Sequence, residues 1–203
     1  MTLKRLLLLL AGLVFAASAM PRSLAEVRLD LEGMLDVNLA MSAEIENALR
    51  VYGEGSGEAE ELRLRLKAIN QKYFLRVEGI VRKYGWPKET QMGAAAVEGA
   101  LLVVLSAEPS EQRRILPVLL EQIQLLELRR GSIAEIEDRV LVYEGKPQKY
   151  GSQFYVDAES GVRRLYPIGD CENVEFLRRS VGLEPLSKYT GALGITHDPC
   201  ANG

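Results

Sequence analysis

The 203-residue sequence predicts an α+β fold that is mainly α, a helical bundle with a small C-terminal β-hairpin. Two observations predict it. Between residues 58 and 143, apolar side chains recur at intervals of three and four, which is the period of one helix face. After Gly145-Lys146-Pro147 the period changes to two, which is typical of a strand. The composition, 47% apolar and 26% charged, is that of an ordinary folded domain.

The chain divides into four segments. We expect a signal peptide in residues 1–19, an N-terminal helical lead-in and Gly-rich linker in 20–57, the helical domain with its hairpin in 58–189, and a tail in 190–203. The linker has glycines spaced as in a phosphate-binding loop. Because it follows a helical pattern instead of a strand, we interpret it as a flexible connection.

The N-terminus has the pattern of an export signal. Lys4 and Arg5 precede the apolar run Leu6–Phe15, and Ala17-Ser18-Ala19 supplies small residues for cleavage after Ala19, with Ser23-Leu24-Ala25 as a second possible site. A retained membrane anchor needs about 20 consecutive apolar residues, and this run is shorter. We therefore expect a periplasmic or secreted mature protein that is not in the membrane after signal cleavage.

Export gives meaning to the two cysteines, Cys171 and Cys200. Thiol pairs tend to close in oxidising compartments, so we expect a disulfide, with two free thiols as the alternative. We expect no metal, because the single histidine, His197, has only Cys200 near it and the four ligands of a zinc site are missing. We also expect no cofactor.

The first half of the chain is predicted to be helical. Val27–Leu39 alternates in part and is either a short extended piece or a helix lead-in, whereas Asn38–Tyr52 has helical spacing. Gly57–Tyr84 is the strongest helix pattern in the sequence. Gly85-Trp86-Pro87 ends it, because glycine suits a left-handed cap and proline cannot continue the helix.

Further helices are expected at 93–107, at 109 to about 130, and at 133–143. The first is apolar most of the way round, which indicates burial at the centre of the bundle. Pro117 is expected to kink or divide the second. Ser132 and Glu135 match a capping box that would start the third.

The C-terminal part combines a hairpin and a last helix. Residues 148–156 are predicted to form a strand, 157–161 a turn and 162–166 the partner strand. A helix is expected at 172–181. The chain after Tyr189 is expected to be a loose tail, except where Cys200 pins it.

The densest polar stretch runs from Asp138 to Gln153, at the junction between helix and hairpin. We take its polar side chains, with one arginine of the last helix, as candidate binding residues: Asp138, Arg139, Gln148, Tyr150, Ser152, Gln153 and Arg179. No complete catalytic set is recognisable among them, so the catalytic residues stay unknown.

Two interpretations of this stretch remain open. As an enzyme site, a carboxylate would act as base and guanidinium groups would bind an anionic substrate, but Ser152 has no histidine or lysine base nearby. As a structural network, Asp138 and an arginine would form a buried pair that joins helix to hairpin, with Gln148 and Gln153 bonding exposed backbone groups. We favour the structural interpretation.

A set of motifs resembles a bacterial family of uncharacterised domains over residues 62–189. The motifs are Gly85-Trp86-Pro87, Asp138-Arg139-Val140, Gly145-x-Pro147-Gln148-x-Tyr150-Gly151-Ser152-Gln153, Arg179 and Gly182-Leu183-x-Pro185-Leu186. The family has no established activity and implies no mechanism. Many members have Gln-His-Ala-Asp at the end of the buried helix, where this chain has Leu105-Ser106-Ala107-Glu108.

These observations favour a domain of the cell envelope that binds a protein or a small-molecule ligand. A hydrolase with a polar site at the helix-to-hairpin junction is the alternative. Nucleic acid is disfavoured as a partner, because 25 basic and 28 acidic residues are interspersed and the net charge is −3.

Overall fold

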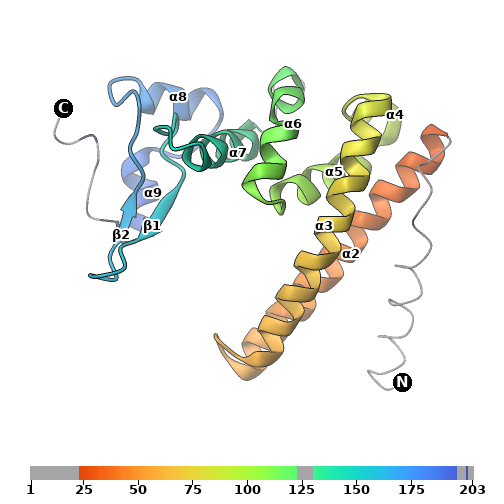
Figure 1. Ribbon diagram of the computed structural model, residues 1–203, viewed down its shortest axis with the longest axis horizontal. Coiled ribbons are helices and arrows are strands. Elements are labelled where there is room, and N and C mark those ends of the chain that lie inside the picture. The colour runs from red at the N-terminus through yellow and green to blue at the C-terminus, as the bar shows by residue number, and fades with distance from the viewer. Residues whose placement is uncertain (1–22, 123–129, 196–199, 201–203) are drawn as a thin grey trace.

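The computed structural model describes residues 23–122, 130–195 and 200. Within them the chain is mainly helical, with one two-stranded antiparallel sheet near the C-terminus, which confirms the predicted fold class (Figure 1). The predicted signal peptide and His197 lie outside the described residues. Among the described residues, none of the helices combines the length and the hydropathy of a membrane span.

The N-terminal half is a long antiparallel hairpin of α2 (Leu24–Tyr52) and α3 (Gly57–Tyr84), shown in orange and yellow in Figure 1. Ser23 starts α2 with a capping box, in which its side chain accepts from the Glu26 amide and the Glu26 carboxylate accepts from the Ser23 amide. The segment 27–39, where an extended piece was one possibility, is entirely helical. Its buried side chains follow helical spacing: Val27, Leu31, Met34 and Asn38.

A buried pair of asparagines fixes how α2 lies against α3. The Asn38 and Asn70 side chains exchange two hydrogen bonds of 3.0 and 2.9 Å, and both residues are at most 3% exposed. A buried amide left without a partner is costly, so sliding one helix past the other is penalised. The pair therefore sets the register of the helical hairpin.

Helix α5 (Ala94–Leu105), which follows the short α4 (Glu89–Met92), is buried as predicted. It packs so closely on α2 that a Cβ atom added at Gly99 would lie 2.1 Å from the Leu31 carbonyl oxygen. Only glycine permits this approach. The main hydrophobic core forms around α5, with apolar side chains from α2, α3, α6 and α7.

The next two helices are α6 (Pro109–Gln122) and α7 (Arg130–Tyr143). Pro117 lies inside α6 without dividing it. Ser132 lies inside α7, so the prediction that a capping box at Ser132 starts this helix was wrong. The buried Ile133 and Ala134 lie next to Ser132 and pack into two different apolar clusters, so packing favours helix through this position.

The C-terminal lobe holds a short hairpin, β1 (Phe154–Val156) paired with β2 (Arg163–Leu165), followed by α8 (Val174–Ser180) and α9 (Leu186–Ala192). In the antiparallel register of these two strands, Tyr155 lies opposite Arg164. The predicted strand is wrong over 148–153, which form a loop apart from an isolated parallel bridge between Gln148 and Ile168. The expectation of a loose tail after Tyr189 is also wrong, because α9 continues to Ala192 and Ile195 is buried in the lobe's apolar cluster.

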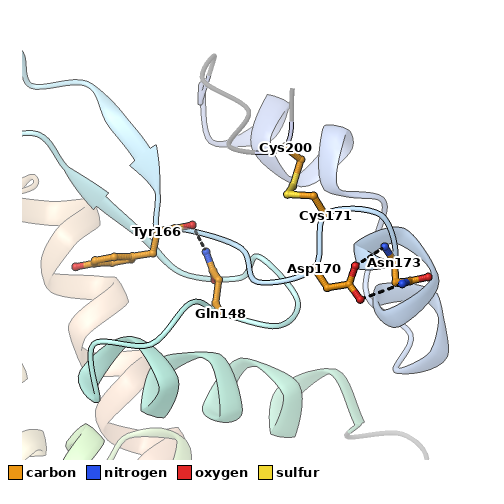
Figure 2. Close-up of a disulfide and its surroundings, with 6 residues drawn as sticks. All are labelled: Gln148, Tyr166, Asp170, Cys171, Asn173 and Cys200. Atoms are coloured by element: carbon orange, nitrogen blue, oxygen red, sulfur yellow. Dashed lines mark hydrogen bonds between the residues drawn. A yellow bond between two sulfur atoms is a disulfide. The ribbon is translucent and has the colours of Figure 1, made fainter. Parts of the chain in front are cut away.

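The predicted disulfide is confirmed: Cys171 and Cys200 are bonded, with their Cα atoms 5.2 Å apart. Figure 2 shows it beside the start of α8, where the Asp170 carboxylate accepts from the amide and the side chain of Asn173. The bond ties the end of the chain to the loop that follows β2. Cys200 packs against the cluster that contains Leu165 and Ile195.

Candidate functional site

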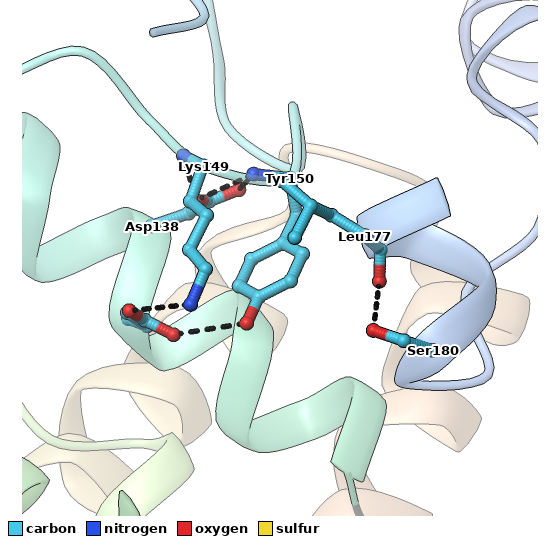
Figure 3. Close-up of polar contacts among 6 residues, drawn as sticks. Asp138, Lys149, Tyr150, Leu177 and Ser180 are labelled. Carbon is cyan, nitrogen blue, oxygen red and sulfur yellow. Dashed lines mark hydrogen bonds and ion pairs between the residues drawn. The ribbon is translucent and has the colours of Figure 1, made fainter. Parts of the chain in front are cut away.

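The Asp138 side chain projects from α7 into the loop formed by residues 148–153, and it is completely buried. Its Oδ1 accepts from the amides of Lys149 (2.6 Å) and Tyr150 (3.0 Å). Its Oδ2 accepts from the amide and the hydroxyl of Ser152, both at 2.9 Å. Figure 3 shows the carboxylate facing the first two of these amides. One side chain thus replaces the strand partner that this backbone would otherwise need, which explains why the loop is not a strand.

The carbonyl side of the same loop faces a cation. Arg178, 2% exposed, donates from Nη1 to the carbonyl oxygens of Tyr150 (2.6 Å) and Gly151 (3.3 Å). The Tyr189 hydroxyl donates to the Ser152 carbonyl at 2.6 Å. Amides therefore point at an anion and carbonyls at a cation, an arrangement in which each peptide dipole is favourably placed.

This geometry corrects the expected pair of Asp138 with an arginine. The hydrogen bonds of the carboxylate go to backbone amides and to Ser152, and the guanidinium of Arg178 lies beyond the peptide units that separate the two charges. Arg179, the candidate residue next to it, is exposed. Burial lowers the pKa of Arg178, and the negative charges of Glu175 and Asp138 oppose that effect.

The side chain of Gln148 links the start of the loop to its end. Its amide group donates to the carbonyls of Gln153 (3.1 Å) and Tyr166 (2.8 Å), and its carbonyl accepts from the Gln153 amide at 2.8 Å. Gly151 has a left-handed φ of +69°, and a Cβ atom there would lie 2.8 Å from the Ile168 side chain. The interior of the loop is thus filled by side chains and hydrogen bonds.

Arg139, the neighbour of Asp138 on α7, lies in a different place, on a cleft next to α3 and the α5–α6 turn. Its Nη1 donates to the Leu105 carbonyl at 3.1 Å. The cleft has a volume of about 450 Å³. Its lining residues are Ile45, Arg63, Leu66, Lys67, Asn70, Ser106, Ala107, Glu108, Pro109 and Arg139. The loop and the cleft are therefore separate features that α7 connects.

Comparison with known protein families identifies the family to which the chain belongs. The family of unknown function DUF6624 matches residues 29–197. The chain belongs to this family. No curated protein and no solved structure matches it. The DUF6624 match includes the whole of the cleft and the whole of the 148–153 loop.

The cleft of this DUF6624 chain is rich in basic groups. Arg63 and Lys67 are four residues apart on one face of α3, and Arg139 comes from α7. Lys67 Nζ lies 2.7 Å from Glu108 Oε1, an exposed ion pair that raises the pKa of Lys67 through hydrogen bonding and charge. Glu108 also precedes α6, whose first turn adds positive potential at the cleft.

The two features differ in what they offer a ligand. In the loop, the Ser152 hydroxyl donates to a buried carboxylate, and both residues are shielded from solvent. Beside it, Glu135 is half-buried; burial raises its pKa, and the charges of Arg139 and Arg178 oppose that effect. No group of three or more His, Cys, Asp or Glu within the described residues is placed to hold a metal ion.

Of the seven candidate residues, the structure brings five together in one hydrogen-bonded network: Asp138, Gln148, Tyr150, Ser152 and Gln153. Sequence reasoning missed the cleft. Arg63 and Lys67 lie four apart on a long amphipathic helix, and such a pair is usually a solvated face. Only the packing of the α5–α6 turn against α3 distinguishes them from other surface cations.

Proposed function

We propose that this DUF6624 chain is an exported binding module that holds a small ligand in the cleft beside α3. The observation that carries the proposal is the composition of the cleft. It has apolar side chains from Ile45, Leu66 and Pro109 together with a positioned polar group, Arg139, which is the usual make-up of a ligand site. Its volume of about 450 Å³ lies within the usual range of about 300–1,000 Å³.

The 148–153 loop supports this assignment indirectly. A ligand that entered it would have to displace hydrogen bonds to a buried carboxylate, because Asp138 and Gln148 are completely buried and bonded to the loop backbone. We assign the loop a scaffolding role: it joins α7 to the C-terminal lobe and thereby holds Arg139 in place. In this family member the turn Leu105-Ser106-Ala107-Glu108 lies at the cleft.

We expect a fragment screen by amide chemical-shift perturbation to give hits at the cleft. Bound fragments should shift the amides of residues 63–70 and 105–108. The substitution Ser106→Trp puts a large side chain at an exposed cleft position and should abolish these shifts. Ser110→Trp is the matched control, because Ser110 is exposed on the first turn of α6 and does not line the cleft.

Two results would contradict the proposal. One is a screen in which no fragment shifts the cleft amides. The other is a set of hits that shift the amides of residues 148–153 and survive Ser106→Trp, which would place the binding site at the loop.

Export is part of the same proposal, supported by the N-terminal pattern and the Cys171–Cys200 bond. Protein recovered from the extracytoplasmic fraction should be lighter than the full chain by about 2 kDa, the mass of a signal peptide of roughly 19 residues. Under non-reducing conditions its mass should also lack two hydrogens. A full-length mass in the membrane fraction, or complete alkylation without reductant, would refute it.

A further inference from the structure

We propose that the ligand of the cleft is an organic anion, a carboxylate or phosphate group that carries a short apolar tail. This inference rests on the proposed function, because it names the chemical class that the same cleft selects. The lining residues include three cations, Arg63, Lys67 and Arg139, and one acid, Glu108. Glu108 pairs with Lys67, and Glu60, which does not line the cleft, lies 3.8 Å from Arg63, an exposed pair that contributes little. The charge balance therefore favours a negative ligand.

Arg139 is the fixed anchor. Its Nη1 is held by the Leu105 carbonyl, and the residue is half-buried. A guanidinium has five N–H donors, so one bond to a carbonyl leaves donors for a bidentate contact with two anionic oxygens. Because the backbone already positions the side chain, less conformational entropy is lost when an anion binds.

Lys67 and Glu108 form an ion pair at the same cleft, and a ligand can replace Glu108 as the partner of Lys67. Their ion pair is short, 2.7 Å, but both side chains are about half exposed, at 58% and 47%. Exposed pairs contribute little net stability. An incoming carboxylate or phosphate can therefore take the place of Glu108 at Lys67 at small cost, and the removal of Glu108 should strengthen binding.

The tail has its own contact surface. Ile45, Leu66, Ala107 and Pro109 line the cleft with apolar atoms, and Ala107 is 8% exposed. Each methylene buried against such a surface raises affinity about fourfold. Neither inorganic phosphate nor acetate can use this surface, so both should bind more weakly than anions with a tail.

The experiment compares four probes with the same eight-carbon tail, namely octanoate, octyl phosphate, octanol and octylammonium, each below its aggregation concentration. Affinity for the disulfide-bonded exported protein is measured by titration of the cleft amide shifts. We expect octanoate and octyl phosphate to bind about tenfold more tightly than octanol, and octylammonium to bind most weakly. The ratio of the two anions decides between a carboxylate and a phosphate ligand.

Variants assign the effect to named groups. Lys67→Gln, at an exposed position that folding tolerates, and Arg139→Gln should each lower the affinity for the anions about tenfold and leave octanol unchanged. Glu108→Gln should raise the anion affinity about threefold. Arg113→Gln is the control, because Arg113 is exposed and pairs with Glu144 away from the cleft.

The outcomes separate this inference from the proposed function. Equal binding of octanol and octanoate at the cleft would overturn the anion class and keep the binding module. Failure of all four probes would overturn the anion class too, and the fragment screen would then decide the proposed function by itself. Anion binding that Lys67→Gln and Arg139→Gln leave unchanged would also overturn the inference.

Discussion

Asp138→Asn is expected to lower the free energy of unfolding by about 3–5 kcal/mol. The carboxylate is completely buried and accepts from three amides and one hydroxyl. Asparagine has one acceptor oxygen, so its NH₂ group would face the amide of either Lys149 or Ser152. Leaving a buried donor unpaired costs about 1–3 kcal/mol, and each lost hydrogen bond to a charged group costs about 1.5–3 kcal/mol.

Chemical denaturation measures this effect, and Asp36→Asn is the matched control. Asp36 is exposed on α2, so its substitution should change stability by less than about 0.5 kcal/mol. If the denaturation midpoint of Asp138→Asn is equal to or above that of the wild type, and the slope m is unchanged, the loop does not depend on the carboxylate. It would also favour a binding role for Asp138, since sites commonly reduce stability.

Gly99→Ala is expected to destabilise the protein by about 3 kcal/mol or more. The new Cβ atom would lie 2.1 Å from the Leu31 carbonyl oxygen, and this oxygen belongs to the backbone of α2 and cannot rotate away. Helices α2 and α5 would have to separate, which would loosen the packing of Leu31 and Ala100. Overpacking of a core usually costs about 1–3 kcal/mol, and a clash with backbone belongs at the upper end.

Gly33→Ala is the control, and it should change the stability in the opposite direction to Gly99→Ala. Gly33 lies inside α2, and nothing is within 4 Å of a Cβ atom built there. Alanine favours helix over glycine by about 0.8–1.0 kcal/mol, so this variant should be slightly more stable than the wild type. If both variants change stability equally, helix propensity and not the close contact determines the result at Gly99.

The helices could be predicted because their signal is local. The spacing of apolar residues in 57–84 predicted a helix with one buried face, and the apolar run at 93–107 predicted a buried helix. Both helices lie within a few residues of the expected bounds. The alternation at 148–153 misled for a physical reason. A strand needs backbone partners, and here the amides are instead bonded by the side chain of Asp138 on the preceding helix.

The candidate site illustrates the same limit. The polar residues of 138–153 could be grouped because they are close in sequence, and a buried role could be favoured because no base accompanied Ser152. The identity of the cation could not be predicted. Arg178 and Arg179 are neighbours, and only the phase of the seven-residue α8 decides that Arg178 is buried. The cleft combines residues from four distant segments, which no sequence pattern links.

The length of the α2–α3 hairpin affects how the protein behaves in solution. At about 1.5 Å per residue, the 29 residues of α2 extend about 43 Å. The hairpin and the C-terminal lobe diverge from the α5–α6 region in different directions (Figure 1). Such a molecule experiences more friction than a sphere of equal mass. Early elution in gel filtration, relative to globular standards near 22.5 kDa, would therefore reflect its outline and would not by itself indicate a dimer.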